Sequence, residues 1–474
     1  MTAMMTVQQA SQWLPTSSLV GTGDAHIVRV HTDTRSIEPG DLFVALKGER
    51  FDANDFLHEA RQRGAVAVVC HGGADPARYP AGLPRIEVAN TTTALGELAA
   101  AWRMQFQLPL IAVTGSNGKT TVTQMLASIL EAYRPGGASL ATRGNLNNDI
   151  GVPLTLLRLR PTHAIAVVEL GMNHPGEIAS LAAMARPTVA LVNNAQREHL
   201  EFMHTVQAVA QENGSVIVAL DGQGTAVFPS DDTYTSVWRA LAGERPTLCF
   251  SLAPNGGAED LGCADVQWTQ GAWQVQAQGT GAVLRYRLAI AGRHNVKNSL
   301  AAAACALAAG VPADAVVRGL EAFVPVKGRS RALALNVQGQ ECTLVDDTYN
   351  ANPDSVRAAI DVLAELPGPR LLVLGDMGEV GQEGPMFHAE AVRYAQARGI
   401  EHLLTLGEST RMATQEFADA RHFESVEELN TVVSATLPSL RSMLVKGSRF
   451  MRMERVVDAA VAFAQNPRSP SHAA

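Results

Sequence analysis

Cysteine, aromatic residues and positive charge are all scarce in this chain of 474 residues. The five cysteines form no CxxC pair, which argues against a disulfide framework and a zinc site, so we expect reduced thiols buried in the core. Lys and Arg total 38 against 46 Asp and Glu, and the formal charge of −8 argues against binding of nucleic acid or anionic membranes. Any polyphosphate ligand therefore needs a local cluster of donors.

A long apolar run and an early basic cluster are also missing. The longest apolar run, Leu300–Val311, is shorter than the ~20 residues that a membrane-spanning helix requires. The first 28 residues contain neither Lys nor Arg, whereas a secretory leader begins with positive charge. We therefore expect a cytoplasmic protein with no membrane span.

The composition is that of a folded protein with several cores. Apolar residues make up 46% of the chain and charged residues 18%, and a length of 474 residues corresponds to about three domains. Two segments of loop composition, Leu108–Pro109 and Pro325–Ser330, mark the expected boundaries. We expect an α/β protein with a small N-terminal unit (residues 1–107), a central unit (108–325) and a C-terminal unit (326–474).

Short apolar runs predict buried parallel strands, and they alternate with helical segments. In the first unit we expect strands at Leu42–Leu46 and Ala65–Cys70 and a helix near Asp55–Arg63. In the second we expect strands at Leu110–Val113, Ala164–Leu170, Val189–Val192 and Thr225–Phe228, helices at Thr120–Glu131 and Val296–Ala309, and hairpins at Val266–Ile290. In the third we expect strands at Cys342–Asp346, Arg370–Leu374, His402–Leu406 and Ser442–Lys446, helices at Ser355–Leu366, His388–Gly399 and Met451–Gln465, and a disordered tail at Asn466–Ala474.

A glycine-containing turn between the first strand and helix of the central unit predicts a phosphate site. Its residues are Thr114, Gly115, Ser116, Asn117, Gly118, Lys119, Thr120 and Thr121. The two glycines let backbone amides converge on an anion, the helix start adds its positive dipole, Lys119 can reach the β- and γ-phosphates, and the Thr120 hydroxyl can ligate Mg²⁺. Val113 stands where the strict motif has its first glycine, so this is the shortened form GxxGKT. The alternative is an ordinary strand-to-helix turn.

Two further residues follow strands of the same sheet. Glu169 ends the strand that begins at Ala164, and His199 lies in the loop after Val189–Val192. Because ligands gather at the carboxyl ends of parallel strands, we expect Lys119, Glu169 and His199 to share one edge as catalytic groups. Thr120, Glu169 and His199 are the candidate metal ligands, with oxygen ligands the more natural for Mg²⁺. Taken singly, Glu169 could be a helix-capping or solvated acid and His199 a backbone-bonded loop residue.

Several segments, in the order in which they occur, resemble the ATP-dependent Mur ligases. They are Thr32–Phe56, Thr114–Thr121 (TGSNGKTT), Val167–Ile178 (VVELGMNHPGEI), Gly292–Ala304 (GRHNVKNSLAAAA), Asp347–Ser355 (DTYNANPDS), Leu374–Gly381 (LGDMGEVG) and Val445–Arg449 (VKGSR). The resemblance spans nearly the whole chain. Within the family, Asp347–Ser355 and the N-terminal segment are similar to the member that joins D-alanyl-D-alanine to a UDP-N-acetylmuramoyl-tripeptide.

The resemblance implies an N-terminal domain that grips the UDP-sugar, a central P-loop ATPase-like domain and a Rossmann-like C-terminal domain. It implies ATP and Mg²⁺ as cofactors and amide-bond formation through an acyl phosphate in the cytoplasmic synthesis of peptidoglycan precursors. Acyl phosphates hydrolyse, so we expect the domains to close and exclude water before the amine arrives. We expect a monomer.

The resemblance also implies where each substrate binds. The UDP-linked substrate is expected at Asp33, Thr34, Arg35, Lys47, Thr142, Asn145, Asn147 and Asn148. Adenine is expected near Asn295 and Asn298, and ribose or phosphate contacts at Arg329 and Asp347. D-alanyl-D-alanine is expected at Tyr349, Asn350, Asn352, Lys446, Ser448 and Arg449.

One departure from the family pattern concerns the metal. Many Mur ligases carry a lysine after the HLE loop that helps to hold a second metal, whereas residues 210–214 read AQENG here. Glu212, Asn213 or water could take its place. Two other functions stay open at this point, namely a folylpolyglutamate synthase-like ligase and a nucleotide-gated binding protein that does not ligate. Phosphate release that requires both substrates distinguishes a ligase from the latter.

Overall fold

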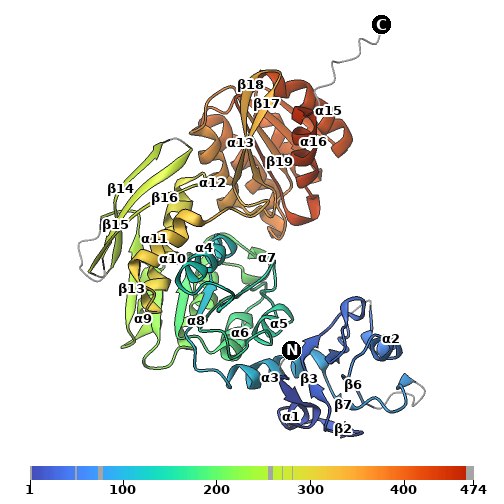
Figure 1. Ribbon diagram of the computed structural model, residues 1–474. Coiled ribbons are helices and arrows are strands. Elements are labelled where there is room, and N and C mark those ends of the chain that lie inside the picture. Colours follow the sequence, from blue (N-terminus) through green and yellow to red (C-terminus); the bar gives the residue numbers. More distant parts are fainter. Residues whose placement is uncertain are drawn as a thin grey trace.

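The computed structural model describes residues 3–48, 51–72, 78–254, 260–269, 271–279 and 281–465. The expected disordered tail, residues 466–474, lies outside these ranges. Within them the chain forms three α/β units that follow one another along the sequence (Figure 1). No helix in this part of the chain is both long and apolar enough to cross a membrane.

The N-terminal unit is built on a small mixed sheet. Its strands, in spatial order, are β2 (Ser18–Val20), β7 (Arg85–Val88), β6 (Ala67–His71), β5 (Asp41–Val44) and β4 (Arg29–His31), and β1 (Met5–Thr6) pairs separately with β3 (His26–Ile27). Its helices are α1 (Val7–Gln12), α2 (Leu57–Gln62) and α3 (Thr91–Arg103). The helix expected from Asp55 begins later, because Asp52 caps a 3₁₀ turn over Ala53–Phe56.

Helix α3 joins the first unit to the second. It packs against α5 (Gly151–Leu156) and α6 (Glu177–Ala185) of the central unit. Its buried Trp102 donates to the Leu159 carbonyl at 3.2 Å, and the buried guanidinium of Arg103 donates to the Ala185 carbonyl at 2.9 Å. One hydrophobic core runs from the first sheet through α3 into the second unit. The boundaries at 107 and 325 stay predictions.

The central unit carries a long sheet that is mostly parallel. Its strands in the described ranges, in spatial order, are β16 (Ala282–Leu288), β15 (Ala272–Gly279), β14 (Leu261–Thr269), β13 (Thr247–Ser251), β12 (Thr225–Pro229), β11 (Val189–Val192), β8 (Leu110–Thr114), β10 (Ile165–Glu169) and β9 (Ser139–Ala141). The remaining helices here are α4 (Lys119–Tyr133), α7 (Leu200–Met203), α8 (Val206–Val218), α9 (Thr235–Ala242), α10 (Arg293–Ala308) and α11 (Ala313–Ala322). The predicted hairpins are the antiparallel strands β14, β15 and β16.

Both faces of the sheet are buried at β8, β10 and β11, which explains the continuous apolar runs in these strands. Leu110 and Ala112 of β8 belong to the core that continues into α3, whereas Ile111 and Val113 belong to the core under α4 and α10. Strands β8, β10 and β11 are parallel neighbours. Their carboxyl ends therefore lie at one edge, as the sequence predicts.

The C-terminal unit has a second, mostly parallel sheet, in which only the pair β17–β18 is antiparallel among the described strands. Its strands in the described residues, in spatial order, are β17 (Arg331–Val337), β18 (Gln340–Asp347), β22 (Ser442–Lys446), β19 (Arg370–Gly375), β20 (His402–Leu406) and β21 (Ala420–Phe423). Its helices are α12 (Pro353–Ala364), α13 (Gly384–Ala397), α14 (Glu408–Ala413), α15 (Val426–Thr436) and α16 (Glu454–Gln465). The last helix starts later than predicted, because Met451 ends a 3₁₀ turn and Arg452 has a φ of +51°.

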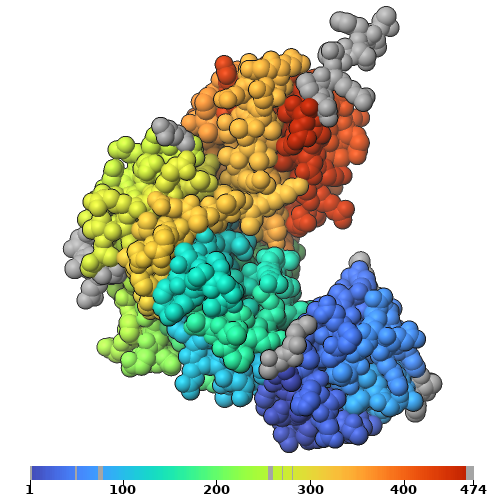
Figure 2. All heavy atoms as spheres, viewed as in Figure 1, coloured from blue at the N-terminus to red at the C-terminus, as the bar shows by residue number. Residues whose placement is uncertain are grey.

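The N-terminal and C-terminal units both adjoin the central unit but do not meet each other in the view of Figure 2. In the space-filling view a gap separates the N-terminal unit from the C-terminal unit, while the central unit touches both (Figure 2). All five cysteines are free and buried. The cavity described next lies where the central and C-terminal units meet.

Candidate active site

A cavity of about 1080 Å³ lies between the central and C-terminal units. The central unit contributes the phosphate turn from Ser116 to Thr121, together with Glu169 and His199. The C-terminal unit contributes Tyr349 and Lys446, among others. Residues predicted from motifs that are far apart in the sequence therefore line one space.

The turn before α4 requires glycine at two positions. Gly115 has a φ of +127° and Gly118 a φ of +84°, both in the left-handed region. A Cβ on Gly115 would lie 2.9 Å from the Asn193 amide nitrogen, and one on Gly118 would lie 2.5 Å from Oδ1 of Asn298. The turn is thus packed tightly against the loop after β11 and the start of α10.

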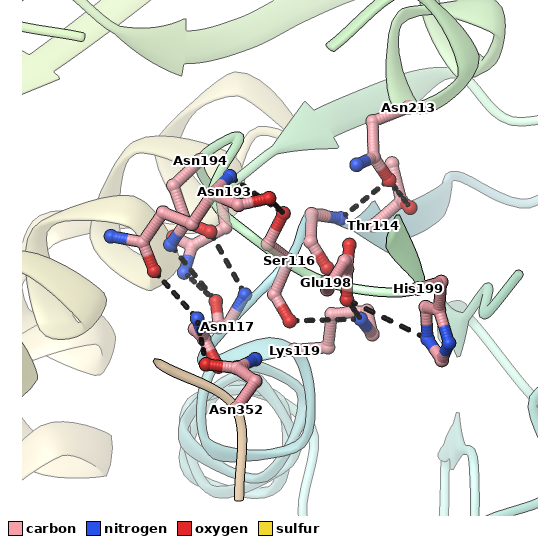
Figure 3. Close-up of polar contacts among 12 residues, drawn as sticks. Thr114, Ser116, Asn117, Lys119, Asn193, Asn194, Glu198, His199, Asn213 and Asn352 are labelled. Carbon is pink, nitrogen blue, oxygen red and sulfur yellow. Dashed lines mark hydrogen bonds and ion pairs between the residues drawn. The ribbon is translucent and has the colours of Figure 1, made fainter. Parts of the chain in front are cut away.

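Asparagines fix the first half of this turn. The amide of Gly115 donates to Oδ1 of Asn213 at 3.1 Å, and the amide of Asn117 donates to Oδ1 of Asn194 at 2.8 Å (Figure 3). The Ser116 amide donates to the Asn194 carbonyl. The amides at the start of α4, which lack intrahelical acceptors, are therefore the ones suited to bind an anion.

Asn295 and Asn298, predicted near adenine, belong to the same network. Nδ2 of Asn193 donates to Oδ1 of Asn298 at 2.9 Å, and Nδ2 of Asn298 donates to Oδ1 of Asn295 at 2.9 Å. Both line the cavity. Through Asn193, these two residues of α10 support the loop that packs against the phosphate turn. Their contact with adenine stays a prediction.

Lys119 points into the same polar cluster. Its Nζ donates to the carbonyls of Gly115 and Ser116, and it lies 3.3 Å from Oε2 of Glu198. Figure 3 shows Glu198 between Lys119 and His199, whose Nε2 is 3.8 Å from the same Oε2. Glu198 was not predicted as a site residue, and its place next to His199 was the one available signal.

Glu169 and Thr120 meet, as predicted. The Thr120 hydroxyl donates to Oε1 of Glu169 at 3.2 Å, and Nδ2 of Asn147 donates to the same oxygen at 2.8 Å. Oε2 of Glu169 is buried and has no hydrogen-bond partner among the described atoms. A buried, unpaired carboxylate oxygen beside a hydroxyl fits a hard divalent cation.

His199 is placed differently from the other predicted metal ligands. Its Nδ1 lies 2.8 Å from Oε2 of Glu379, and this histidine lowers the pKa of that carboxyl chiefly through a hydrogen bond. Within the described ranges, no group of three His, Cys, Asp or Glu side chains could hold a metal unaided. A cation here would therefore need further oxygen ligands, such as hydroxyl groups, water or a bound anion.

The wall from the C-terminal unit is strongly charged. Nζ of Lys446 lies 2.6 Å from Oδ2 of Asp347 and donates to the Asn350 carbonyl at 2.9 Å. Arg329 lies over the Tyr349 ring, 3.8 Å from its centroid, and donates to the Thr120 hydroxyl at 3.1 Å. Burial lowers the pKa of Arg329. Arg329 therefore links the phosphate turn to the aromatic wall.

Other contacts also join the two units. Nδ2 of Asn352 donates to Oδ1 of Asn117 at 3.0 Å, which ties the start of α12 to the phosphate turn. Arg197 lies 2.7 Å from Oδ1 of Asp354 and 2.8 Å from Oε2 of Glu390. Arg197 and Glu390 lie in none of the predicted motifs, and Asp354 lies within the segment Asp347–Ser355 but was not predicted as a site residue.

Some of the remaining predicted residues line the cavity, and others lie outside it. Thr142 is buried and accepts from the Glu169 amide at 2.9 Å, so it positions that acid from behind. Ser448 is buried and accepts from the Gly378 amide. Asn145 and Asn148 line the cavity. Thr34 begins a 3₁₀ turn in the N-terminal unit.

The charged residues of the N-terminal unit pair locally. Arg35 forms a hydrogen-bonded pair with Asp33 that lowers the pKa of the acid to about 2, and the Arg35 side chain is 84% exposed. Lys47 lies 3.8 Å from Asp52. None of the four predicted residues of this unit lines the cavity between the other two.

The two side chains proposed to replace the missing lysine have structural partners. Glu212 accepts from the amides of Gly176 and Ile178 at the start of α6, at 2.9 and 2.8 Å. Asn213 accepts from the Thr114 hydroxyl at 2.6 Å and from the Gly115 amide. Both side chains therefore stabilise the backbone around the site. The carboxylate oxygens of Glu212 and the amide oxygen of Asn213 all accept hydrogen bonds, whereas Oε2 of Glu169 accepts none among the described atoms.

Comparison with known proteins agrees with this arrangement. Three family models match successive parts of the chain: "Mur ligase family, catalytic domain" at residues 26–103, "Mur ligase middle domain" at 113–306, and "Mur ligase, glutamate ligase domain" at 331–449. The UDP-N-acetylmuramoyl-tripeptide–D-alanyl-D-alanine ligase of Escherichia coli (strain K12) is 40% identical over 438 residues, which cover 92% of this chain and 94% of that protein. The enzyme of that name from Haemophilus influenzae is 36% identical, with 96% and 98% covered.

Solved structures show the same likeness in three dimensions. A crystal structure of MurF from Acinetobacter baumannii matches with a TM-score of 0.87 and 34% identity, covering 97% of this chain and 99% of that chain. MurF from Thermotoga maritima in complex with ADP matches at 0.80 with 25% identity, covering 93% and 98%. Folylpolyglutamate synthase from Mycobacterium tuberculosis, at 0.62 and 17% identity over 80% of this chain and 95% of that one, shows a shared fold alone. The predicted three-part α/β fold and family resemblance are confirmed, and the chain belongs to the Mur ligase family.

Proposed function

We propose that the protein is an ATP-dependent ligase that joins D-alanyl-D-alanine to UDP-N-acetylmuramoyl-tripeptide, a step of peptidoglycan precursor synthesis. The observation that carries this proposal is the end-to-end similarity to the E. coli and H. influenzae ligases of that name, at 40% and 36% identity. The cavity supports it, because one wall is a phosphate turn and the other carries the Asp347–Lys446 pair beside Tyr349. A folylpolyglutamate synthase-like activity is not favoured, since that likeness is limited to the fold.

The chemistry requires activation of a carboxylate. A carboxylate oxygen is a poor leaving group, so transfer of the γ-phosphoryl group to the tripeptide's terminal carboxylate forms an acyl phosphate. The amine of the dipeptide attacks the acyl carbon, and phosphate leaves from the tetrahedral intermediate. The first step brings two anions together, and Lys119 with the amides opening α4 offsets their repulsion. Arg329, hydrogen-bonded to Thr120, adds a second cation at this place.

Mg²⁺ belongs to the same proposal. Thr120 and Glu169 would hold it, because they are in contact and Oε2 of Glu169 is buried without a partner. When bound, the cation would neutralise charge on the phosphates. His199 is kept as a third candidate ligand, although its recorded partners in this structure are Glu198 and Glu379.

Each substrate is assigned to a different part of the molecule. We place the UDP-linked substrate at Asp33, Thr34, Arg35, Lys47, Thr142, Asn145, Asn147 and Asn148, with the adenine of ATP near Asn295 and Asn298. The gap between the N-terminal and C-terminal units supports this, because it leaves room for an extended nucleotide-sugar peptide beside the central unit (Figure 2). The dipeptide is assigned to Tyr349, Asn350, Asn352, Lys446, Ser448 and Arg449.

The wall that would hold the dipeptide carries two cationic side chains. Lys446 is held by Asp347, and Arg449 lies 5.8 Å from the Tyr349 centroid. An ammonium and a guanidinium on this wall suit the carboxylate of D-alanyl-D-alanine, whose amine can then face the acyl group. We further propose that the enzyme acts as a monomer in the cytoplasm.

Phosphate release tests the proposed function directly. Purified enzyme with ATP and Mg²⁺ is assayed with neither, either or both of UDP-N-acetylmuramoyl-tripeptide and D-alanyl-D-alanine. A ligase gives rapid release and the pentapeptide product only with both substrates. Release that does not depend on the dipeptide identifies a nucleotide-gated binding protein instead.

A further inference from the structure

Glu198 is a buried acid in the cavity wall with an incomplete set of partners. Its side chain is 5% exposed, and Oε2 lies 3.3 Å from Nζ of Lys119 and 3.8 Å from Nε2 of His199. Oε1 is also buried but has no hydrogen-bond partner among the described atoms. Burying a carboxylate oxygen without a partner lowers the stability of the fold unless a cation or a hydrogen-bond donor binds it in another state of the enzyme.

Lys119 holds three acceptors at once in this structure. These are the carbonyls of Gly115 and Ser116, at 2.5 and 3.2 Å, and Oε2 of Glu198 at 3.3 Å. An ammonium group has three protons to donate, so all of them are in use. Lys119 can therefore contact a phosphate only by giving up one of these partners. Glu198 makes the longest of the three contacts.

Release of Lys119 would leave Glu198 as a buried, unpaired charge. Its other recorded ionic partner offers little compensation, because His199 lies 3.8 Å away and its second ring nitrogen faces Glu379. Glu169 likewise has a buried oxygen without a partner, and both acids line the cavity. Two such oxygens beside a phosphate turn are suited to a hard divalent cation.

We propose that Glu198 is a positioning residue that exchanges partners when nucleotide binds: it pairs with Lys119 in the free enzyme and with the divalent cation of the nucleotide complex. The proposal rests on the proposed function only in taking ATP with Mg²⁺ as the ligand. In the free enzyme Glu198 keeps Lys119 over the turn. In the complex its carboxylate supplies negative charge to the cation.

The exchange predicts that removing the Glu198 charge affects nucleotide binding differently with and without Mg²⁺. In Glu198→Gln the amide oxygen can still accept from Lys119, but the charge is gone. Binding of the non-hydrolysable analogue AMP-PNP without Mg²⁺ should be unchanged or tighter, because no carboxylate competes with the phosphates for Lys119. The enhancement of binding by Mg²⁺ should fall by at least about tenfold, the scale on which metal sites lose affinity when a supporting residue is removed.

Calorimetric titration of wild type and Glu198→Gln with AMP-PNP, in EDTA and in Mg²⁺, measures both quantities. Glu201→Gln removes the same charge from an exposed position three residues along and should change neither. Glu198→Asp keeps the charge but shortens the side chain by one methylene, so this variant should reduce the Mg²⁺ enhancement by a smaller factor. If Glu198→Gln melts at a much lower temperature than wild type, Glu198→Asp takes its place in the test.

Equal loss of affinity in both conditions would show that Glu198 merely supports the turn and would overturn the proposal. An unchanged Mg²⁺ enhancement in Glu198→Gln, or in Glu198→Asp where the first variant is unfolded, would overturn it too. Failure of the wild type to bind AMP-PNP in either condition would instead overturn the proposed function, and this inference with it.

Discussion

Arg197 of the central unit and Asp354 of the C-terminal unit form a two-point contact across the cavity. The backbone amide of Arg197 donates to Oδ2 of Asp354 at 2.8 Å, and its Nη2 lies 2.7 Å from Oδ1. The same guanidinium reaches Glu390 on α13, which Arg357 also contacts. One cation is thus shared by two acids from two helices of the other unit, and the pKa of Arg197 is raised, chiefly by its hydrogen bonds to Asp354. This contact holds the two walls of the cavity together.

Arg197→Ala should favour a more open arrangement of the two units. The three charged groups are 23–29% exposed, so solvent weakens the pair and a loss of about 1 kcal/mol, or roughly fivefold in closing equilibrium, is expected. The KM for D-alanyl-D-alanine should rise by a similar factor with little change in kcat. Small-angle scattering of the ligand-free protein should give a larger radius of gyration.

The matched control is Arg393→Ala. Arg393 lies on the same helix as Glu390, and its partner Glu416 is in the same unit. This variant should leave both the KM and the scattering profile as in wild type. Identical profiles for wild type and Arg197→Ala would mean that the contact does not govern closure.

Lys119→Ala should abolish most turnover while the protein stays folded. Loss of a preorganised charge at the transferring phosphoryl group typically costs about 10²–10³-fold in kcat. Glu198 loses its cation partner, so a modest fall in melting temperature is expected, while the hydrophobic cores, which do not include Lys119, keep the protein folded. Steady-state phosphate release and a thermal melt measure the two effects. Near wild-type turnover with an unchanged melting temperature would remove Lys119 from the reaction.

The buried strands and the ends they share could be predicted from the sequence. Leu110–Val113 and Val189–Val192 are apolar at every position, as strands covered on both faces must be, and both are strands of the central sheet. Their parallel neighbours place Lys119, Glu169 and His199 at one edge, which follows from strand order alone. The phosphate turn could be recognised because its glycines are required by backbone conformation.

The partners of these residues could not be predicted in the same way. Arg197 and Asp354 are 157 positions apart, and their contact depends on how two separate units meet. Glu198 looks like any loop acid until its burial beside Lys119 is known. Strand β17 was not predicted, because it lies at the edge of the sheet and most of its residues are exposed, so it has no continuous apolar run. Local patterns therefore identified elements and motifs, whereas packing between units determined the rest.

Gly118→Ala should impair nucleotide binding by two additive effects. A φ of +84° costs a Cβ-bearing residue about 1–2 kcal/mol, and the new Cβ would lie 2.5 Å from Oδ1 of Asn298 and 2.6 Å from Nδ2 of Asn193. We expect AMP-PNP affinity to fall at least about tenfold. Gly399→Ala isolates the first effect, because its φ is +73° and no atom lies within 4 Å of the new Cβ. That variant should lose a little stability and no affinity.

The Asp347–Lys446 pair should give the C-terminal unit an acid-sensitive part of its stability. Burial opposes ionisation of Asp347, but Lys446, His294 and Arg329 outweigh it and lower its pKa below the ordinary value. A carboxyl with a lowered pKa in the folded state stabilises the protein above its unfolded-state pKa, near 3.9, and this contribution is lost as pH falls through the lower folded value.

Asp347→Asn should therefore destabilise the protein at pH 7 by about 3 kcal/mol, since it leaves Lys446, whose side chain is 4% exposed, buried without its counter-charge. The difference from wild type should be constant down to about pH 4 and shrink below it. Denaturant unfolding at several pH values, followed by a probe in the C-terminal unit, measures this difference. Asp458→Asn breaks the exposed pair with Lys327 in the same unit and should have little effect at any pH, because water screens charges that are 56–61% exposed. A loss for Asp347→Asn that persisted undiminished at low pH would mean that the pair contributes through packing and not through charge.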